Sequence, residues 1–110
     1  MTRVPLQTTI GDGKDRQVDL LFQGPRRRLV QITLRRGTVL ERHTAAVPIT
    51  IQGIAGSGTL HVAGAEPVAL TPGVLVTIEP NVPHEIRPTP DVSVLLTQFT
   101  DSAPGPAKQP

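Results

Sequence analysis

Glycine and proline interrupt this chain so often that it has little room for long regular elements. Twelve prolines and ten glycines are spread over its 110 residues, and both residue types favour turns over the interiors of helices and strands. No long stretch shows the repeat of about 3.6 residues in apolar side chains that an amphipathic helix requires. We therefore expect an all-β chain of about nine short strands, closed into an antiparallel barrel that leaves few exposed edges.

The expected strands are the apolar runs between these breaks. In the run at 29–34, Val30, Ile32 and Leu34 share one face and polar residues occupy the other, which is typical of a strand buried on one side. The Gly56-Ser57-Gly58 triplet is expected to end one strand, and residues 63–66 are expected to connect a hairpin. The other strands are expected at 18–22, 38–45, 49–54, 59–62, 67–70, 74–78, 84–87 and 92–99.

The length of the chain predicts a single domain. We expect an irregular lead-in at 1–17, the barrel at 18–100 and a loose proline-rich tail at 101–110. No run approaches the ~20 apolar residues that span a bilayer, and the start of the chain lacks the apolar core of a signal peptide. Cysteine is absent, so no disulfide framework exists and a cytoplasmic protein is expected.

Basic residues are concentrated in the first part of the chain. Residues 1–46 carry nine Lys or Arg and four Asp or Glu, whereas the remainder carries two and five. The run Arg26–Arg28 would suit an anionic partner, but a solvated turn is the favoured interpretation because no nucleic-acid motif accompanies it. Phe22 and Phe99 are the only Phe, Tyr or Trp residues. Single-stranded nucleic acid would lack stacking partners here, and the core must consist of Val, Leu and Ile.

Two histidines, His43 and His84, are the strongest candidates for a binding site. Gly37 precedes His43 by six residues, and Gly73 precedes His84 by eleven. Because alternate residues of a strand share a face, Glu41 is expected beside His43. Imidazole is a common metal ligand, but catalytic zinc requires three protein ligands and non-haem iron requires two histidines and a carboxylate. Glu41 would complete such a set, although a solvated position at the barrel rim is the favoured interpretation.

The first histidine lies in a segment that resembles the first motif of the cupin superfamily, whose members are small β-barrels with a metal or ligand pocket inside. That motif is G-x5-H-x-H-x3-E-x6-G, and Gly37, His43 and Gly56 match it in spacing. Ala45 occupies the position of the second histidine, and Ile49 occupies that of the glutamate.

The second histidine lies in a segment that resembles the second cupin motif, G-x5-P-x-G-x2-H-x3-N. Gly73 and His84 match this pattern in spacing. Glu79, Asn81 and Pro88 stand where proline, glycine and asparagine are usual. Both motifs are free of gaps, and sixteen residues separate them.

The resemblance covers roughly residues 30–100 and implies an antiparallel double-stranded β-helix, or jelly-roll barrel. It also implies a set of four metal ligands, of which this chain keeps His43 and His84. Ala45 and Ile49 have no donor atoms at the other two positions and would line an apolar pocket for a small molecule. The full expected lining is Val39, Glu41, Ala45, Ile49, Ile51, Val76 and Ile78.

Three functions remain open on the sequence alone. The leading hypothesis is a small barrel that binds an organic molecule, with no chemistry evident from the residues. The alternative is a metal-dependent oxygenase or isomerase in which His43, His84 and either Glu41 or water hold Fe, Mn, Ni or Zn. The third is an interaction module that acts through Arg26–Arg28. His61 lies between two apolar residues that are expected to face the core, and is therefore expected to point outward.

The expected partners are a small-molecule ligand and a second copy of the chain. By resemblance to small cupins, a homodimer is expected, and the apolar strand at 18–22 is the candidate for pairing or exchange across it. Neither a membrane nor a nucleic acid is an expected partner.

Overall fold

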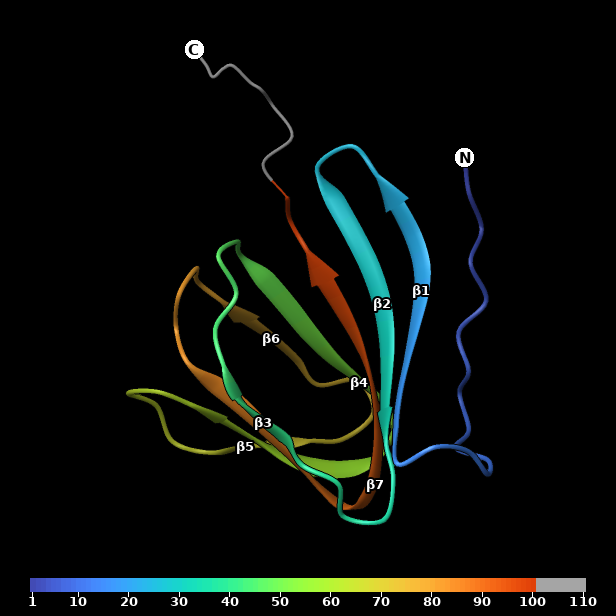
Figure 1. Ribbon diagram of the computed structural model, residues 1–110, viewed down its shortest axis with the longest axis vertical. Helices are drawn as coiled ribbons and strands as arrows, with labels where there is room; N and C mark the ends of the chain where they lie inside the picture. Colours follow the sequence, from blue (N-terminus) through green and yellow to red (C-terminus); the bar gives the residue numbers. More distant parts are fainter. Residues whose placement is uncertain (101–110) are drawn as a thin grey trace.

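The computed structural model describes residues 1–100 and shows an all-β chain whose strands pair in antiparallel fashion (Figure 1). The expected fold class is therefore confirmed. The described part of the chain contains no helix that is long and apolar enough to cross a membrane. The expected tail at 101–110 lies outside the described residues. The strands are β1 (Arg16–Gly24), β2 (Arg27–Leu34), β3 (Leu40–His43), β4 (Ile49–Val62), β5 (Val68–Leu70), β6 (Leu75–Ile78) and β7 (His84–Gln98).

The two longest strands, β4 and β7, run through both sheets of the fold. The second half of β7 pairs with β2 and with the first half of β4. The first half of β7 pairs with β3 and with the second half of β4. One sheet is therefore β1-β2-β7-β4-β6, and the facing sheet is β3-β7-β4-β5. The hairpin expected around residues 63–66 is present and connects β4 to β5.

A cluster of glycines allows β4 to bend from one sheet into the other. The Gly56-Ser57-Gly58 triplet does not end a strand, contrary to the sequence prediction, because β4 continues through it with one register shift just before it and one within it. Gly56 has a φ of 69°, and a Cβ atom there would lie 2.2 Å from the carbonyl oxygen of Asp91 on β7. The expected strands at 84–87 and 92–99 likewise form one bent strand, so the described chain has seven strands instead of about nine.

The core between the two sheets consists of Val, Leu and Ile side chains, as the composition requires. The aromatic residues lie outside it, and Phe99 is 46% exposed. Strands from both sheets contribute to this core, which explains why β4 and β7 must bend around it. The core residues are Val30, Ile32, Leu34, Ile49, Ile51, Leu60, Leu70, Ile78, Ile86, Val92 and Val94.

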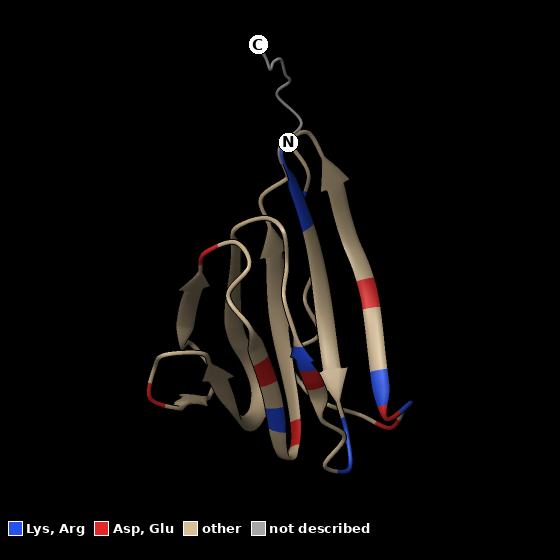
Figure 2. Cartoon of the chain, turned by 60° about the vertical axis from the view of Figure 1, so that its left-hand side comes forward, with Lys and Arg blue, Asp and Glu red and all other residues tan. Residues whose placement is uncertain are grey.

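The arginine-rich segment begins in the turn between β1 and β2 with Arg26 and continues into β2 with Arg27 and Arg28. The guanidinium carbon of Arg27 lies 4.7 Å from the ring centroid of Phe22, and Arg28 donates a hydrogen bond to Gln98 on β7. Figure 2 shows basic residues at several separate places along the fold, with acidic residues beside many of them. Arg27 is therefore in contact with β1 through Phe22, and Arg28 with β7 through Gln98.

Strand β2 is buried on both faces, whereas its alternation predicted burial on one. Gln31 and Thr33 on β2, and Arg35 directly after it, point away from the core, yet they are only 1%, 6% and 7% exposed. The reason is the N-terminal segment, residues 1–15, which forms no strand of its own and runs along the outside of β1 and β2 (Figure 1). Polar side chains on this face of β2 therefore meet backbone groups instead of bulk water.

The bend in β4 leads to a stability prediction for Gly56→Ala. A left-handed backbone costs an L-residue about 1–2 kcal/mol, and the contact with the Asp91 carbonyl adds an overpacking cost of about 1–3 kcal/mol. Gly64 is the matched control, because its φ is 78° but a Cβ atom there would meet nothing within 4 Å. Urea unfolding should show a markedly larger loss for Gly56→Ala than for Gly64→Ala. Equal losses would contradict the role given to the bend.

Candidate functional site

The pairing of β3 with β7 brings the two candidate histidines together. His43 and His84 are opposite one another in the register, and their ring centroids are 4.4 Å apart with an interplanar angle of 61°. His84 is 3% exposed, whereas His43 is exposed. The pair therefore joins the buried interior to the surface at one end of the fold, which we call the barrel mouth.

The loop before β7 sets the position of His84. In this loop the backbone N–H of Asn81 donates a hydrogen bond of 2.7 Å to the carbonyl of Ala45. The backbone N–H of Ala63 donates one of 2.9 Å to the carbonyl of Pro83. Asn81 stands where glycine is usual in the second cupin motif and has a φ of 65°. Asparagine is among the residues that adopt this left-handed conformation most readily. The loop therefore keeps its backbone path without the glycine.

Both imidazoles are oriented by backbone carbonyls two residues upstream. Nδ1 of His84 lies 2.9 Å from the carbonyl oxygen of Val82, and Nδ1 of His43 lies 2.8 Å from that of Glu41. A carbonyl oxygen only accepts hydrogen bonds, so each Nδ1 must carry the proton. In the neutral ring, Nε2 is then left as an acceptor or a metal ligand.

The surroundings of His84 favour its neutral form. Burial lowers the pKa of His84 from its ordinary value of 6.5; the bond to the Val82 carbonyl opposes this shift, and charge on His43 lowers the pKa further. His84 therefore offers an unprotonated Nε2 near neutral pH.

The described residues do not supply a complete metal site of the cupin type. Among residues 1–100, no group of three or more His, Cys, Asp or Glu side chains is placed to hold a metal ion. A register shift between Leu40 and His43 interrupts the alternation that would put Glu41 on the His43 face. Glu41 is exposed and lines a surface cavity of about 410 Å³ together with His43, Arg16 and Arg42.

The expected apolar lining is divided between the core and the rim of the fold. Ile49, Ile51 and Ile78 are 2%, 2% and 3% exposed and belong to the core. Ala45 and Val76 are partly buried and pack against that core. Val39 is partly buried and precedes β3.

The structure adds three apolar residues beside the histidine pair that the sequence analysis did not single out. Val62 is opposite His84 in the register, Leu40 is opposite Ile86, and the Val82 carbonyl holds the His84 ring. All three are partly buried against the core. Only the pairing register could have identified them, and the sequence does not contain it.

The outer face of the same strands carries a separate polar group. His61 is opposite Glu85 in the register and adjoins the fully buried Leu60, so it lies on the outer side as expected. Glu85 pairs with Arg87. The hydrogen bond from Arg87 is the main reason that the pKa of Glu85 lies below its ordinary value of 4.5.

Comparison with known proteins identifies the fold. No protein-family model and no curated protein sequence matches the chain. An RmlC-like cupin protein from Desulfovibrio desulfuricans superimposes with a TM-score of 0.76 and 20% identity, covering 90% of this chain and 96% of that one. An RmlC-like cupin with a double-stranded β-helix fold from Methanocaldococcus jannaschii gives a TM-score of 0.72 and 20% identity, covering 90% of each chain. This chain has the cupin fold.

Proteins with the cupin fold include enzymes. The DMSP lyase DddQ from Ruegeria pomeroyi superimposes on this chain with a TM-score of 0.74 and 16% identity, covering 83% of this chain and 50% of that one. Identity at this level establishes the shared fold, and the chemistry of this chain must be argued from its own residues.

The buried His84 gives this chain a pH-dependent stability. The pKa of His84 is lower in the folded chain than in the unfolded chain. Unfolding therefore takes up a proton once the pH is below the pKa of the unfolded chain. The contribution of His84 to the free energy of unfolding is therefore fully present above pH 6.5, and it is lost as the pH falls below that value. Urea titrations at about pH 7.5 and about pH 5.5 should show this loss, and His84→Gln should reduce it.

The matched control for this measurement is Ile86→Val, which changes a buried neighbour without a titratable group. It should lower stability by about 1 kcal/mol at both pH values and leave the pH dependence unchanged. A His84→Gln variant with the same pH dependence as the wild type would contradict the assignment.

Proposed function

We propose that this cupin binds a small, mainly apolar organic molecule at the barrel mouth and holds it through the histidine pair. The observation that carries the proposal is the orientation of the two rings, because each Nδ1 is occupied by a carbonyl and each Nε2 is left for another partner. A neutral His84 accepts a hydrogen bond from a hydroxyl or amide group of the ligand. The valine and leucine side chains around the pair supply the apolar contacts.

The substitutions within the cupin motifs support binding over metal chemistry. Ala45 and Ile49 replace two ligand positions with side chains that have no donor atoms, and Ile49 is built into the core. The apolar contribution of such a site scales with the area removed from water, while the two nitrogens select for a ligand that carries a hydrogen-bond donor.

Phenol and toluene test this proposal, because the two molecules are similar in shape and differ in one hydroxyl group. Followed by NMR titration of the backbone amides, phenol should bind more tightly and shift residues around His84. His84→Ala should remove most of this preference, since a hydrogen bond contributes about 0.5–1.5 kcal/mol. His61→Ala, on the outer face, should keep it. Equal binding of both probes, or a preference unchanged in His84→Ala, would refute the proposed role of the pair.

A metal-dependent cupin enzyme of the oxygenase or isomerase type is the second candidate. The observation that favours it is the pair of Nε2 atoms on two adjacent rings, which suits a divalent ion of Fe, Mn, Ni or Zn. His43 and His84 would be two protein ligands, and the third donor would come from Glu41 or water. Such an ion would polarise a substrate oxygen.

Metal content distinguishes the two candidates. Under the ligand-binding proposal, elemental mass spectrometry should find no stoichiometric metal in untagged wild-type protein, even after exposure to each of the four ions. His43→Ala and His84→Ala serve as the reference variants. Near-stoichiometric metal in the wild type that is lost from both variants would establish the second candidate instead.

We also propose that two copies of the chain pair through β1. This strand lies at the end of its sheet, and its Val18 and Leu20 side chains are 55% and 54% exposed. They lie on the same side as the core residues of β2. Antiparallel pairing of two β1 strands about Leu20 would bring Val18 and Leu20 of both copies onto one shared apolar face, which makes the contact self-complementary.

Light scattering on the purified chain tests this pairing. The wild type should be a dimer, and Leu20→Asp should shift it to a monomer because two charges would meet at the two-fold axis. Leu75→Asp on β6 is the matched control, since Leu75 is 62% exposed and lies away from β1. A monomeric wild type, or equal effects of the two variants, would contradict pairing through β1.

A further inference from the structure

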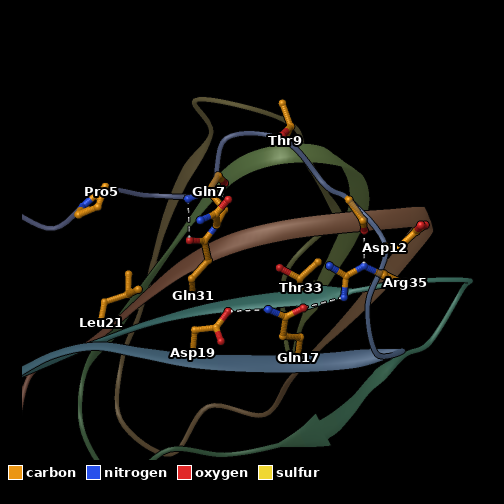
Figure 3. Close-up of a pocket in the computed structure, with 11 residues that line it drawn as sticks. Pro5, Gln7, Thr9, Asp12, Gln17, Asp19, Leu21, Gln31, Thr33 and Arg35 are labelled. Carbon is orange, nitrogen blue, oxygen red and sulfur yellow. Dashed lines mark hydrogen bonds between the residues drawn. The ribbon is translucent and has the colours of Figure 1, made fainter.

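A second cavity, of about 390 Å³, lies between the N-terminal segment and the outer face of β1 and β2 (Figure 3). It is lined by alternate residues within 5–11, 17–21 and 31–35 and by Asp12. It is separated from the barrel mouth by β2, whose opposite face forms the core. Its volume falls in the range of about 300–1,000 Å³ that small-molecule sites occupy.

Polar contacts hold the N-terminal segment over this cavity. The Gln31 amide accepts a hydrogen bond from the Gln7 backbone N–H at 3.1 Å and donates one to the Gln7 carbonyl at 2.8 Å. It also donates to Ser93 on β7 at 2.8 Å. The side chain of Gln31 therefore bonds to the backbone of the N-terminal segment as a neighbouring strand would. These bonds hold the segment above the sheet.

Arg35 is a buried cation at one end of the cavity. Its Nε donates to the Gly11 carbonyl, and its Nη1 donates to the Lys14 carbonyl and to the Gln17 side-chain oxygen, each at 2.8 Å. The ion pairs found within residues 1–100 involve Arg36 and Arg87, so in that range no carboxylate neutralises Arg35. A charge that is 7% exposed is normally paired. Its remaining nitrogen, Nη2, points into the cavity (Figure 3).

Asp19 supplies the opposite charge along the same wall. Nε2 of Gln17 donates a hydrogen bond of 2.9 Å to the Asp19 carboxylate. The single amide of Gln17 therefore connects Arg35 to Asp19, with its oxygen on the cation and its nitrogen on the anion. The cavity consequently has a cationic end and an anionic end.

We infer that this cavity binds a small molecule that carries a carboxylate at one end and an amino or hydroxyl group at the other. The carboxylate accepts hydrogen bonds from Nη2 of Arg35, and the amino or hydroxyl group donates to Asp19. The ligand lies beside Gln17. Like the Gln17 amide, it offers an acceptor oxygen to Arg35 and a donor group to Asp19. A carboxylate is the natural partner for a guanidinium, because the two form charge-assisted hydrogen bonds.

Three probes of similar length test the inference on the full chain: butyrate, butylamine and 4-aminobutyrate. Each is titrated at millimolar concentration while backbone amides are followed by NMR. 4-Aminobutyrate should bind most tightly, butyrate about tenfold more weakly, and butylamine least. The shifted amides should lie within 5–11, 17–21 and 31–35. Shifts confined to the barrel mouth, or no shift with any of the three probes, would overturn the inference.

Two variants separate ligand recognition from the anchoring of the N-terminal segment. Asp19→Asn keeps a hydrogen-bond acceptor for Gln17, so the segment should stay in place. This variant should remove the preference for 4-aminobutyrate over butyrate. Arg35→Lys keeps the positive charge but cannot reproduce the guanidinium geometry, and it should weaken butyrate binding about tenfold.

Glu66→Gln is the matched control, because it replaces an exposed carboxylate between β4 and β5 that does not line the cavity. It should leave the affinities for all three probes unchanged. If Arg35→Lys does not fold, the Asp19→Asn comparison still decides the question. Binding that is the same in the wild type and in Asp19→Asn would overturn the two-ended site.

Discussion

The continuous pairing of β4 with β7 is the constraint on which the rest of the structure depends. The two strands stay paired from Ile49 opposite Gln98 to Val62 opposite His84 while both bend between the sheets. At one end this pairing places His84 against Val62 and presents it to His43 on β3. At the other end it places Ser93 behind β2, where it accepts a hydrogen bond from Gln31. One ladder thus positions the barrel mouth and supports the wall of the polar cavity.

The fold could be predicted from the sequence because its signals are local. Alternating apolar residues and frequent turns can be recognised in a single sequence without knowing which strands pair. The spacing of the two histidines from their glycines can be recognised in the same way. The main error concerned Gly56, whose residue type suits a turn and a strand bulge equally well. Whether the chain reverses or merely bends there depends on the carbonyl of Asp91, which lies close to Gly56 in space but far from it in the sequence.

The candidate site was harder to predict, because its geometry depends on register and on covering segments. The expectation that Glu41 lies beside His43 assumed regular alternation, whereas the two residues line one surface cavity across a register shift in β3. The polar cavity left no signal at all. A residue such as Gln31 occupies the same alternating position whether water or another part of the chain covers it, and the segment that covers it forms no regular element.

The mode of attachment of the N-terminal segment divides the molecule into two levels of stability. Hydrogen bonds from Gln31 and Arg35 hold the segment, whereas apolar burial holds the sheets. Lifting the segment exchanges these hydrogen bonds for bonds to water and leaves the apolar core closed, so it costs less free energy than unfolding the barrel. Solvent therefore reaches the guanidinium of Arg35 through a local opening, on a timescale that is independent of the lifetime of the folded barrel.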